Sequence, residues 1–585
     1  MDSYGKVDPY NQSQLETSRK LRKRWFILSF VGILLVAAII VGLVVGLRKR
    51  ESNNGTQSTT NQLIVDACKS TQYPETCVTS LSAFSQGSSP TNPQDIIKMS
   101  FQIAIAELGQ AVDLVQNLTQ AEGNSSLASI FTDCKENLVA SIQQMNFSAL
   151  EFANISLQNL QSDLDDVTTM LSSALTLHST CVDDILENIT GNSTDQIRSG
   201  GVYVAELLSN ALALFSSFSS AADGLPALPT RRLLSKSSQS EEQPDSLLYE
   251  TEGGYPRWLS AGSRRLLADL YSRPNSVVAQ DGSGKFRRIQ DAVNAAPNDI
   301  KTGLYVIHVK AGVYWEQVSI PSSKVSIAIV GDGIGKTVIA NNLNVQMKGM
   351  TTFKSATVAI GAPGVVFRDL TIQNRAGAAA HQAVALRVSA DRVVIFRCSL
   401  EGNQDTLYAH NGRQFYTNSV IQGTVDFMFG NAAAVFQSCT LLALKPLTGQ
   451  QVTLTAQGRI DRNQNTGFSF QLCSVVGSLD LQKVISIAPV YLGRPWKLYS
   501  RTVFIKCNLS FIVNKAGWLN WIGDFALKTL FYGEFQNTGA GAGTNQRVSW
   551  STQMTARQAK EYNVLPFITR SNWITITGTF YLPYV

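Results

Sequence analysis

The feature that most constrains the fold of this 585-residue chain is an apolar repeat in its C-terminal half. An aromatic residue, then Cys or Ser, then a branched aliphatic residue recur at a nearly constant interval. A repeat of this length predicts a solenoid with one coil per repeat. The copies are Phe396-x-Cys398-x-Leu400, Tyr416-x-x-Ser419-x-Ile421 and Phe436-x-x-Cys439-x-Leu441, with shorter copies at Phe470-x-x-Cys473 and Phe504-x-x-Cys507.

Two aspartates, Asp405 and Asp426, are separated by one length of this repeat and so occupy equivalent places in consecutive copies. Successive strands of a parallel β-solenoid stack about 4.8 Å apart, so we expect the two side chains to lie one above the other. A lone aspartate in such a turn is more often part of a structural polar ladder. The pair instead predicts an enzyme that brings two carboxyl groups to one bound substrate.

The net charge of +6 hides opposite charges in the two halves of the chain. Residues 63–224 contain 4 Lys and Arg against 18 Asp and Glu, a net charge of −14, whereas residues 273–585 contain 30 against 15, a net charge of +15. Charges of opposite sign and this size predict mutual attraction, and a basic half predicts a polyanionic partner. The alternative is two solvated domains whose charges differ for unrelated reasons.

Residues 25–47 form a continuous apolar run that is long enough to span a bilayer. A basic cluster in residues 1–24 outweighs the one at 48–50, which favours a cytoplasmic N-terminal tail and a lumenal remainder. Because the run is long for a cleavable signal, we expect a signal anchor in the secretory pathway. Eight glycosylation triplets agree with a lumenal location, at Asn54, Asn117, Asn124, Asn146, Asn154, Asn188, Asn192 and Asn508.

After a polar linker, residues 48–62, the segment 63–224 has apolar residues at alternating intervals of three and four. Four such runs predict an antiparallel four-helix bundle. In an oxidising lumen, disulfides are expected in this bundle, although the sequence leaves their connectivity open. The candidates are Cys68 with Cys77, which would close an N-terminal hairpin, and Cys134 with Cys181, which would join two helices.

Residues 225–272 lose this periodicity and form a linker with added Pro, Ser and Gly. The linker contains two nearly identical dibasic segments, Arg231-Arg232-Leu233-Leu234 and Arg264-Arg265-Leu266-Leu267. One such pair is explained by a solvated basic linker, but two copies in an accessible segment predict proteolytic processing at Arg232 or Arg265.

From residue 273 to 585, short Val, Ile and Phe runs end in Gly, Asn or Asp, and no long helical period occurs. With the coil-length repeat, this predicts a right-handed parallel β-helix. A β-sandwich is the alternative, but the hairpin turn signals it requires are sparse. The expected fold class is therefore multi-domain: a membrane-spanning helix, an all-α four-helix bundle and an all-β parallel β-helix.

Five motifs follow one another in the β-rich half: Gly312-Val313-Tyr314-Trp315-Glu316, Gln382-Ala383-Val384-Ala385-Leu386, Gln404-Asp405-Thr406-Leu407, Asp426-Phe427-Met428-Phe429-Gly430 and Leu492-Gly493-Arg494-Pro495-Trp496. Together, and in this order, they resemble the signature set of plant pectin methylesterases. The bundle resembles a pectin methylesterase inhibitor domain, with the same four-helix, four-cysteine plan. The resemblance to the enzyme covers about residues 275–584 and implies hydrolysis of methyl esters of cell-wall pectin by an enzyme made with an inhibitor-like pro-region.

The resemblance also implies a role for each site residue. It places Arg494 beside Asp426, which would then be the ionised nucleophile that forms an acyl-enzyme. Asp405 would be the protonated acid that releases methanol and afterwards activates water. Two stacked carboxyl groups cannot both ionise easily, so their pKa values are expected to move apart. Gln382 and Gln404, about one coil apart, would donate hydrogen bonds to the oxyanion.

Three tryptophans are candidates for stacking on sugar rings: Trp496 and Trp518, with Trp521 behind them. Tryptophans are as often core residues. Thr352 resembles a substrate-contacting threonine of the family. Ser419 stands where many relatives have a cysteine that would meet Cys439, so that disulfide is expected to be absent, at a cost of about 2–4 kcal/mol.

The four histidines show no metal-ligand spacing and no Gly-x-Ser-x-Gly elbow occurs, so we expect no metal, no cofactor and no serine triad. One alternative is a pectin lyase or polygalacturonase on the same solenoid, and another is a non-catalytic wall-binding or inhibitor protein. The expected partners are methyl-esterified pectin, the intramolecular pro-region, a processing protease and, through residues 25–47, a membrane, but no nucleic acid. The expected location is a membrane-anchored precursor whose catalytic domain is secreted to the cell wall.

Overall fold

The computed structural model describes residues 55–85, 90–122, 126–156, 158–188, 193–223, 251–252, 255–256, 273–569 and 573–585. The chain divides into two compact units, Met1–Gln62 and Leu63–Val585. The expected anchor at 25–47 and both dibasic sites lie outside the described residues. Within the described part, one helical segment, Ile197–Ala222, is long and apolar enough to cross a membrane, and 56% of its most apolar window is buried, as in the core helix of a soluble bundle.

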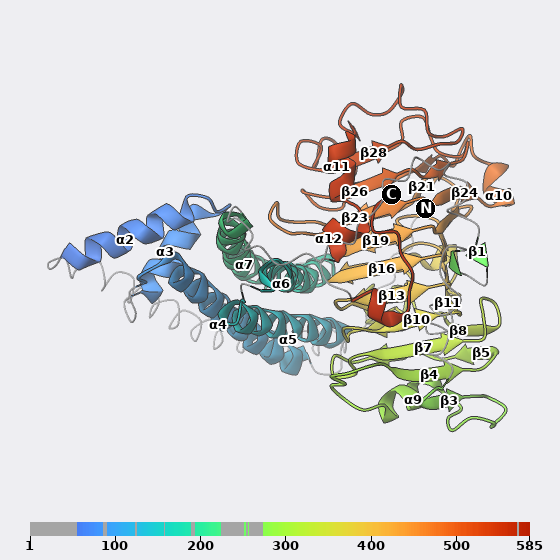
Figure 1. The fold of residues 1–585 in the computed structure, drawn as a ribbon, viewed down its shortest axis with the longest axis horizontal. Helices are drawn as coiled ribbons and strands as arrows, with labels where there is room; N and C mark the ends of the chain where they lie inside the picture. Colours follow the sequence, from blue (N-terminus) through green and yellow to red (C-terminus); the bar gives the residue numbers. More distant parts are fainter. Residues whose placement is uncertain are drawn as a thin grey trace, which may run out of the picture. The chain divides into compact units, whose positions relative to one another are not determined.

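The N-terminal part of the described chain is helical (Figure 1). Four long helices bury their apolar faces in one core, which contains Phe101, Leu138, Leu171 and Leu208. The four-helix prediction therefore agrees with the structure, which adds two shorter helices at the start. The helices are α2 (Gly55–Cys68), α3 (Pro74–Phe84), α4 (Pro93–Glu122), α5 (Ser126–Ala153), α6 (Leu160–Asn188) and α7 (Ser193–Asp223).

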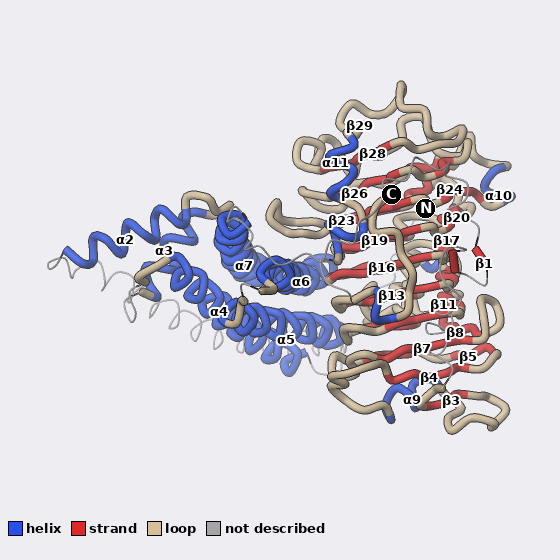
Figure 2. The backbone as a smooth tube through the Cα atoms, viewed as in Figure 1, coloured by secondary structure: helices blue, strands red, loops and turns tan. Residues whose placement is uncertain are grey.

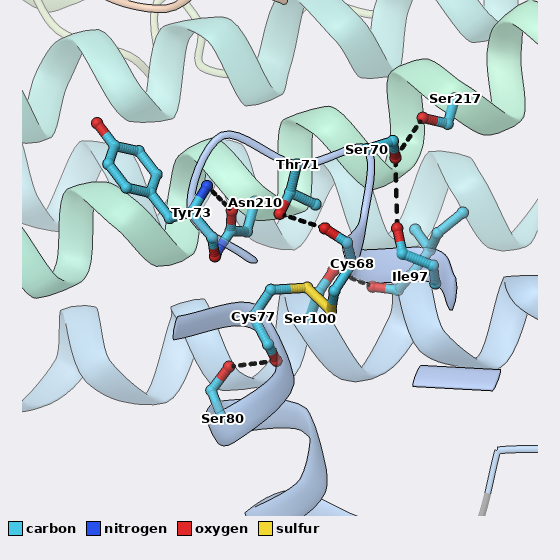
Figure 3. The surroundings of a disulfide bond; sticks show 11 residues. Cys68, Ser70, Thr71, Tyr73, Cys77, Ser80, Ile97, Ser100, Asn210 and Ser217 are labelled. Carbon is cyan, nitrogen blue, oxygen red and sulfur yellow. Dashed lines mark hydrogen bonds between the residues drawn. A yellow bond between two sulfur atoms is a disulfide. The ribbon is translucent and has the colours of Figure 1, made fainter. Parts of the chain in front are cut away.

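Two disulfides lie in the helical region. Cys68 and Cys77 join the end of α2 to α3 (Figure 3), and Cys134 and Cys181 join α5 to α6. The hairpin closed by the first disulfide is also tied to α7, because the Asn210 side chain accepts from the Tyr73 N–H and donates to the Tyr73 carbonyl, at 3.3 and 2.9 Å.

Most strands of the C-terminal part stack into three large parallel sheets (Figure 2), and two short strands form a separate parallel pair. The largest sheet has eleven strands: β3 (Ser276–Val278), β4 (Tyr305–Val309), β7 (Ile327–Gly331), β10 (Val366–Arg368), β13 (Val393–Phe396), β16 (Arg413–Thr417), β19 (Ala433–Gln437), β23 (Gly467–Gln471), β26 (Arg501–Ile505), β28 (Phe531–Phe535) and β29 (Thr552–Gln553).

The second sheet has eight strands and the third has six. The second contains β5 (Gly312–Trp315), β8 (Thr337–Asn341), β11 (Thr371–Asn374), β14 (Ser399–Glu401), β17 (Val420–Gly423), β20 (Thr440–Ala443), β24 (Ser474–Gly477) and β27 (Asn508–Leu509). The third contains β6 (Val318–Ile320), β9 (Val358–Ile360), β12 (Leu386–Ser389), β15 (Leu407–Asn411), β18 (Met428–Gly430) and β22 (Thr455–Gln457).

The central coils take one strand from each sheet in turn, as β16, β17 and β18 do, so this part is a parallel β-helix. The strand pairings within these three sheets are all parallel, which excludes the β-sandwich alternative. The remaining elements are β1 (Thr251–Glu252), β2 (Tyr255–Pro256), β21 (Val452–Thr453), β25 (Val490–Tyr491), α9 (Ile289–Ala295), α10 (Leu479–Gln482), α11 (Ala556–Glu561), α12 (Val564–Ile568) and two short 3-10 turns, Ala378–Ala380 and Thr575–Thr577.

A ladder of aromatic rings runs through the interior of the β-helix. Tyr416, Phe436, Phe470 and Phe504 stack in consecutive coils with ring centroids 4.5 to 4.6 Å apart. The sequence repeat was misaligned at its first copy, because Ile395 and not the following Phe396 pairs with Tyr416. Side chains alternate across a strand, so Phe396 points outward, where it packs in a cluster with α12.

The repeat also brings four cysteines and a serine into one interior row. The thiols of Cys398, Cys439, Cys473 and Cys507 are buried and unpaired. Ser419 stands between the first two, where its hydroxyl accepts from the Cys398 N–H at 3.1 Å and donates to the Thr417 carbonyl at 2.9 Å. Cys439 therefore meets a serine on one side, as the sequence indicated, but a second thiol, Cys473, on the other.

The turn that follows a strand of the eleven-stranded sheet uses one left-handed residue in each of seven coils, from β10 to β28. The φ angles at this position lie between 49° and 58°, which costs a non-glycine residue roughly 1–2 kcal/mol. Each of these residues except Gln536 donates its N–H to a carbonyl of the next coil, at 2.8 to 3.2 Å, which offsets that cost. The series is Asp369, Arg397, Asn418, Ser438, Leu472, Lys506 and Gln536.

Candidate active site

Asp405 and Asp426 lie at the same turn of neighbouring coils, between the eight-stranded and the six-stranded sheet. Leu407 pairs with Met428 just after them, and the Asp405 N–H donates to the Val425 carbonyl at 3.1 Å. Both aspartates have a left-handed backbone, with φ of 63° and 49°. They are only 8% and 5% exposed. Strained, buried carboxyl groups stacked one coil apart are typical of a functional site.

Two glycines make this packing possible. A Cβ on Gly423 would lie 2.2 Å from that of Phe427, in the turn that leads to Asp426. A Cβ on Gly493 would lie 2.0 Å from the Thr455 hydroxyl. The chain at Gly493 therefore approaches β22 closely, and the next N–H, that of Arg494, donates to the Thr455 carbonyl at 3.0 Å. This close approach positions the Arg494 side chain over the two aspartates.

Arg494 and Asp426 form a two-pronged ion pair. Arg494 Nε lies 2.9 Å from Oδ1 of Asp426, and Nη2 lies 2.6 Å from Oδ2. The Thr453 hydroxyl donates to the same carboxylate at 2.6 Å. Bidentate pairing with a guanidinium favours the charged form of a carboxylate.

Asp405 has the opposite environment. Burial raises its pKa well above the usual aspartate value, and the negative charge of Asp426 raises it further, while Arg494 opposes both. A neutral Asp405 beside an anionic Asp426 is the arrangement in which one carboxyl group donates a proton and the other attacks.

Two amide side chains line the same pocket. Gln382 and Gln404 are both half-buried there, and no described side chain hydrogen-bonds to either amide. The chain segments that carry them are in contact, because the Ala383 N–H donates to the Gln404 carbonyl at 3.3 Å. Their N–H groups are free to donate to an oxyanion formed on a bound ester.

The aromatic wall of the pocket differs from the predicted one. Trp496 and Trp521 line it, and the Trp521 ring lies 4.4 Å from the Arg494 guanidinium. The prediction that Trp518 contacts the substrate is wrong. Its side chain is 1% exposed and packs in the core, with its ring 4.4 Å from that of Tyr532. Trp518 and Trp521 lie close together in an irregular loop, and no periodicity marks which of them faces inward.

From the sequence we predicted Thr352 at the pocket but not three aromatic residues that line it, Phe353, Tyr408 and Phe429. Thr352 lines the pocket, and so do Tyr408 and Phe429, whose rings stack at 4.2 Å. A signal for these two was present: each follows an inward-facing residue of its strand, Leu407 or Met428, and so must face outward.

The far wall of the pocket comes from the helical bundle. Thr180, Asp183, Asp184 and Glu187 of α6 line the cavity of about 230 Å³ together with the residues described above. Asp183 forms an ion pair with Lys497 at 2.7 Å. Burial raises the pKa of Asp184 well above its usual value and raises that of Glu187, with repulsion among these carboxyl groups adding to both. Helix α6 therefore covers the cleft with acidic side chains.

Further contacts hold the acidic bundle to the basic β-helix. Lys354 pairs with Asp133 and Glu136 of α5, at 3.2 and 3.0 Å. The Thr180 hydroxyl lies 2.7 Å from the His410 ring nitrogen Nε2. The opposite charges of the two halves thus meet at this interface.

The other candidate residues that the structure describes do not line this pocket. Four glycosylation acceptors, Asn117, Asn146, Asn154 and Asn508, are exposed. Asn54, Asn124 and Asn192 lie outside the described residues, as do Arg232 and Arg265, and the side chain of Asn188 is not described. In the described ranges, no three His, Cys, Asp or Glu side chains gather where they could hold a metal ion.

Fold and site together define a β-helical enzyme whose pocket combines an arginine-bound carboxylate with a second carboxyl group of raised pKa. Residues 275–572 match the family described as pectinesterase, and residues 62–214 match the family described as plant invertase/pectin methylesterase inhibitor. The chain belongs to the pectinesterase family.

Individual relatives resemble nearly the whole chain. Pectinesterase 1 of Citrus sinensis is 39% identical over 584 residues, 98% of each chain. Pectinesterase/pectinesterase inhibitor U1 of Solanum lycopersicum is 36% identical over 589 residues, also 98% of each. Among solved structures, the pectin methylesterase from carrot is 49% identical, with a TM-score of 0.53, and the match covers 54% of this chain and 99% of that one.

Proposed function

We propose that this protein hydrolyses methyl esters of cell-wall pectin, releasing methanol and leaving free galacturonate carboxylates. The observation that carries the proposal is the stacked pair of Asp405 and Asp426, with Arg494 bound to one member only. This asymmetry supplies a nucleophile and a proton donor within reach of one ester.

In the proposed mechanism, a carboxylate oxygen of Asp426 attacks the ester carbonyl carbon. The carbonyl oxygen becomes an oxyanion, which the amides of Gln382 and Gln404 stabilise. Asp405 gives its proton to the departing methoxy oxygen, so methanol leaves and an acyl-enzyme anhydride remains. Asp405, now ionised, takes a proton from water as the water attacks the anhydride, which frees the galacturonate and restores both aspartates.

The substrate would lie along the outer face of the six-stranded sheet. Trp496 and Trp521 flank the catalytic pocket and offer ring faces for pyranose stacking, and Thr352 offers a hydroxyl. The basic charge of residues 273–585 suits a polymer that gains carboxylates as the reaction proceeds.

We further propose that residues 63–224 act as an autoinhibitory pro-region. Helix α6 lines the catalytic pocket, so a polymer could not enter while the bundle is docked. Cleavage in the linker 225–272, at Arg232 or Arg265, would release the domain 273–585 to the cell wall. Residues 25–47 would hold the precursor in a membrane of the secretory pathway until then, with residues 1–24 in the cytoplasm and 48–62 as a spacer.

A methanol assay tests the proposal. Domain 273–585 should release methanol from methyl-esterified pectin, and the uncleaved chain should do so far more slowly. Asp426→Asn should abolish the release, while Asp480→Asn, a change at an exposed residue of α10, should leave it intact. Shortening of the polymer without methanol release would favour a polygalacturonase or lyase, and binding without any product would favour a non-catalytic wall protein.

A further inference from the structure

A row of arginines lies on the β-helix at or just before the first residues of strands in the eleven-stranded sheet, and none of them is a proposed catalytic residue. Arg392 and Arg413 precede the paired residues Val393 and Gln414, so they are neighbours in consecutive coils. The same position is held by Ala433 and Gly467 in the next two coils, and by Arg501 in the one after. We call Arg392, Arg413 and Arg501 the arginine row.

The row borders a pocket of about 350 Å³. Arg413 and Arg501 line it, with Tyr562, Phe567 and other residues of the C-terminal segment. Gly467 makes room for Arg501: a Cβ at this glycine would lie 2.9 Å from the Arg501 side chain. The small residues Ala433 and Gly467 therefore leave space between Arg413 and Arg501.

No described carboxylate forms an ion pair with Arg501, although Asp165 of α6 also lines the pocket. Among the described residues, none accepts a hydrogen bond from its guanidinium, and burial lowers its pKa below the usual arginine value. Glu561 stands at the rim of the pocket but is exposed. Burying part of a charged guanidinium without an anion costs free energy. We therefore expect an anionic ligand at Arg501.

The other end of the row shows which anion fits. Asp166 of α6 bridges Arg392 and Arg413, with oxygen–nitrogen distances of 2.5 and 2.7 Å. Arg413 also binds Asp391 of its own domain at 2.6 Å, but no residue of the β-helix other than Asp391 pairs with Arg392 in the described chain. Loss of the bundle would remove the Asp166 carboxylate and leave Asp391 as the one described carboxylate shared by the two guanidinium groups, with a net positive charge.

We propose that, in the enzyme freed from its bundle, the arginine row binds a run of unesterified galacturonate residues, and that Asp166 occupies this position in the precursor. The proposal rests on the proposed function for the identity of the polymer. Arg413 and Arg501 are three coils apart, about 14 Å at the spacing of parallel strands. A single carboxylate cannot bridge that distance, so the ligand is an extended chain with several carboxylates. Bound there, the enzyme's own product would hold it on the polymer.

The test compares binding of unesterified polygalacturonate at low salt by the uncleaved chain, by domain 273–585 and by its variants. The solved carrot enzyme, whose chain matches this domain over 99% of its length, indicates that such a domain folds alone. All proteins carry Asp426→Asn so that no ester is consumed. The row variant is Arg392→Gln with Arg501→Gln, and the matched control is Arg375→Gln, an exposed arginine after β11.

We expect the row variant to bind polygalacturonate about tenfold more weakly than the parent domain, because two charge-assisted contacts are lost. The control should bind like the parent, and the uncleaved chain should bind more weakly than the free domain. Binding of fully methyl-esterified pectin should not differ between the row variant and the parent. Equal thermal unfolding midpoints would show that both variants are folded.

The proposal is overturned if the row variant binds polygalacturonate within twofold of the parent, or if the control loses as much affinity. Methanol release by the domain with Asp426 intact is measured separately. If the domain releases methanol but its row variant binds polygalacturonate normally, only the proposal about the arginine row is overturned. If the domain releases no methanol, the proposed function is overturned.

Discussion

Two side chains of the same type acquire different chemistry here because their immediate neighbours differ. The Asp426 carboxylate accepts hydrogen bonds from Arg494 and Thr453. No described side chain hydrogen-bonds to Asp405, and its pKa is raised by burial and by the charge of Asp426. Sequence spacing predicts the stacking of the two aspartates, but the difference between them depends on Arg494, which binds Asp426 from the loop after β25.

At the residue scale, we predict that Arg494→Gln lowers kcat for methanol release by domain 273–585 by roughly 10²-fold, because the charge of the nucleophile loses its partner. Arg494→Lys should restore only part of the rate, since lysine cannot form the two-pronged contact. Steady-state kinetics on methyl-esterified pectin measure both. Lys483→Gln, at an exposed pair on α10, is the control, and equal rates for the Gln and Lys variants would contradict the role given to the guanidinium.

Elements of the β-helix depend on a few close approaches and on the aromatic ladder. Gly493 lets the loop after β25 pass directly over β22, and the stacked rings of Phe436, Phe470 and Phe504 continue through three coils. Both features are local in space but join segments that belong to different coils, so a change in one coil is transmitted to its neighbours.

Gly493→Ala should destabilise the protein and reduce activity together. The added Cβ would lie 2.0 Å from the Thr455 hydroxyl, and overpacking of this kind costs about 1–3 kcal/mol. Because the displaced residue precedes Arg494, methanol release should fall as well. Gly543→Ala, whose Cβ would have its nearest neighbour at 3.8 Å, should change neither the unfolding midpoint nor the rate. An active, fully stable Gly493→Ala protein would show that the loop has room to move.

Phe470→Ala should cost about 3–5 kcal/mol of unfolding free energy, because it removes the middle ring of a fully buried stack. Chemical denaturation measures the change. Phe511→Ala is the matched control: its side chain is 58% exposed, so its loss should have little effect. Similar costs for the two variants would mean that the ladder adds nothing to stability beyond surface packing.

On the scale of the whole molecule, an acidic bundle covers the pocket of a basic domain, and the pKa values of several carboxyl groups of the bundle are raised. Burial is the first cause of the raised pKa of Asp184 and Glu187 in α6, and likewise for Asp133 in α5. A group whose pKa is higher in the docked state stabilises docking at low pH, and this contribution is lost as the pH rises through the docked pKa.

We therefore predict that a chain cleaved in its linker is inhibited by its bundle more strongly at acidic pH, and that inhibition weakens as the pH rises. Added salt should also weaken it, because the ion pairs at Lys354 and Lys497 are partly exposed. Asp184→Asn cannot ionise and should extend inhibition to higher pH, whereas Asp113→Asn, at an exposed site on α4, should not. Methanol release measured across a pH series gives the answer, and superimposable profiles for all three proteins would contradict the prediction.

Periodicity along the chain was sufficient to predict the solenoid, the helical bundle and the stacking of Asp405 on Asp426, because strand alternation, helix spacing and coil length are properties of neighbouring residues. The resemblance to plant pectin methylesterases supplied the prediction that Arg494 lies beside Asp426. The first copy of the apolar repeat was aligned on Phe396, although Ile395 is the residue that pairs with Tyr416. A register shift of one residue changes which side chain enters the core.

Only the tertiary structure decided which side chains face one another across loops and between domains. Trp521 and not Trp518 reaches the pocket, since an irregular loop has no period to reveal its inward face. Helix α6 covers the cleft and places Asp166 on the arginine row, which joins segments far apart in the sequence. Such pairings depend on how two finished domains fit together, and no local pattern in either domain contains that information.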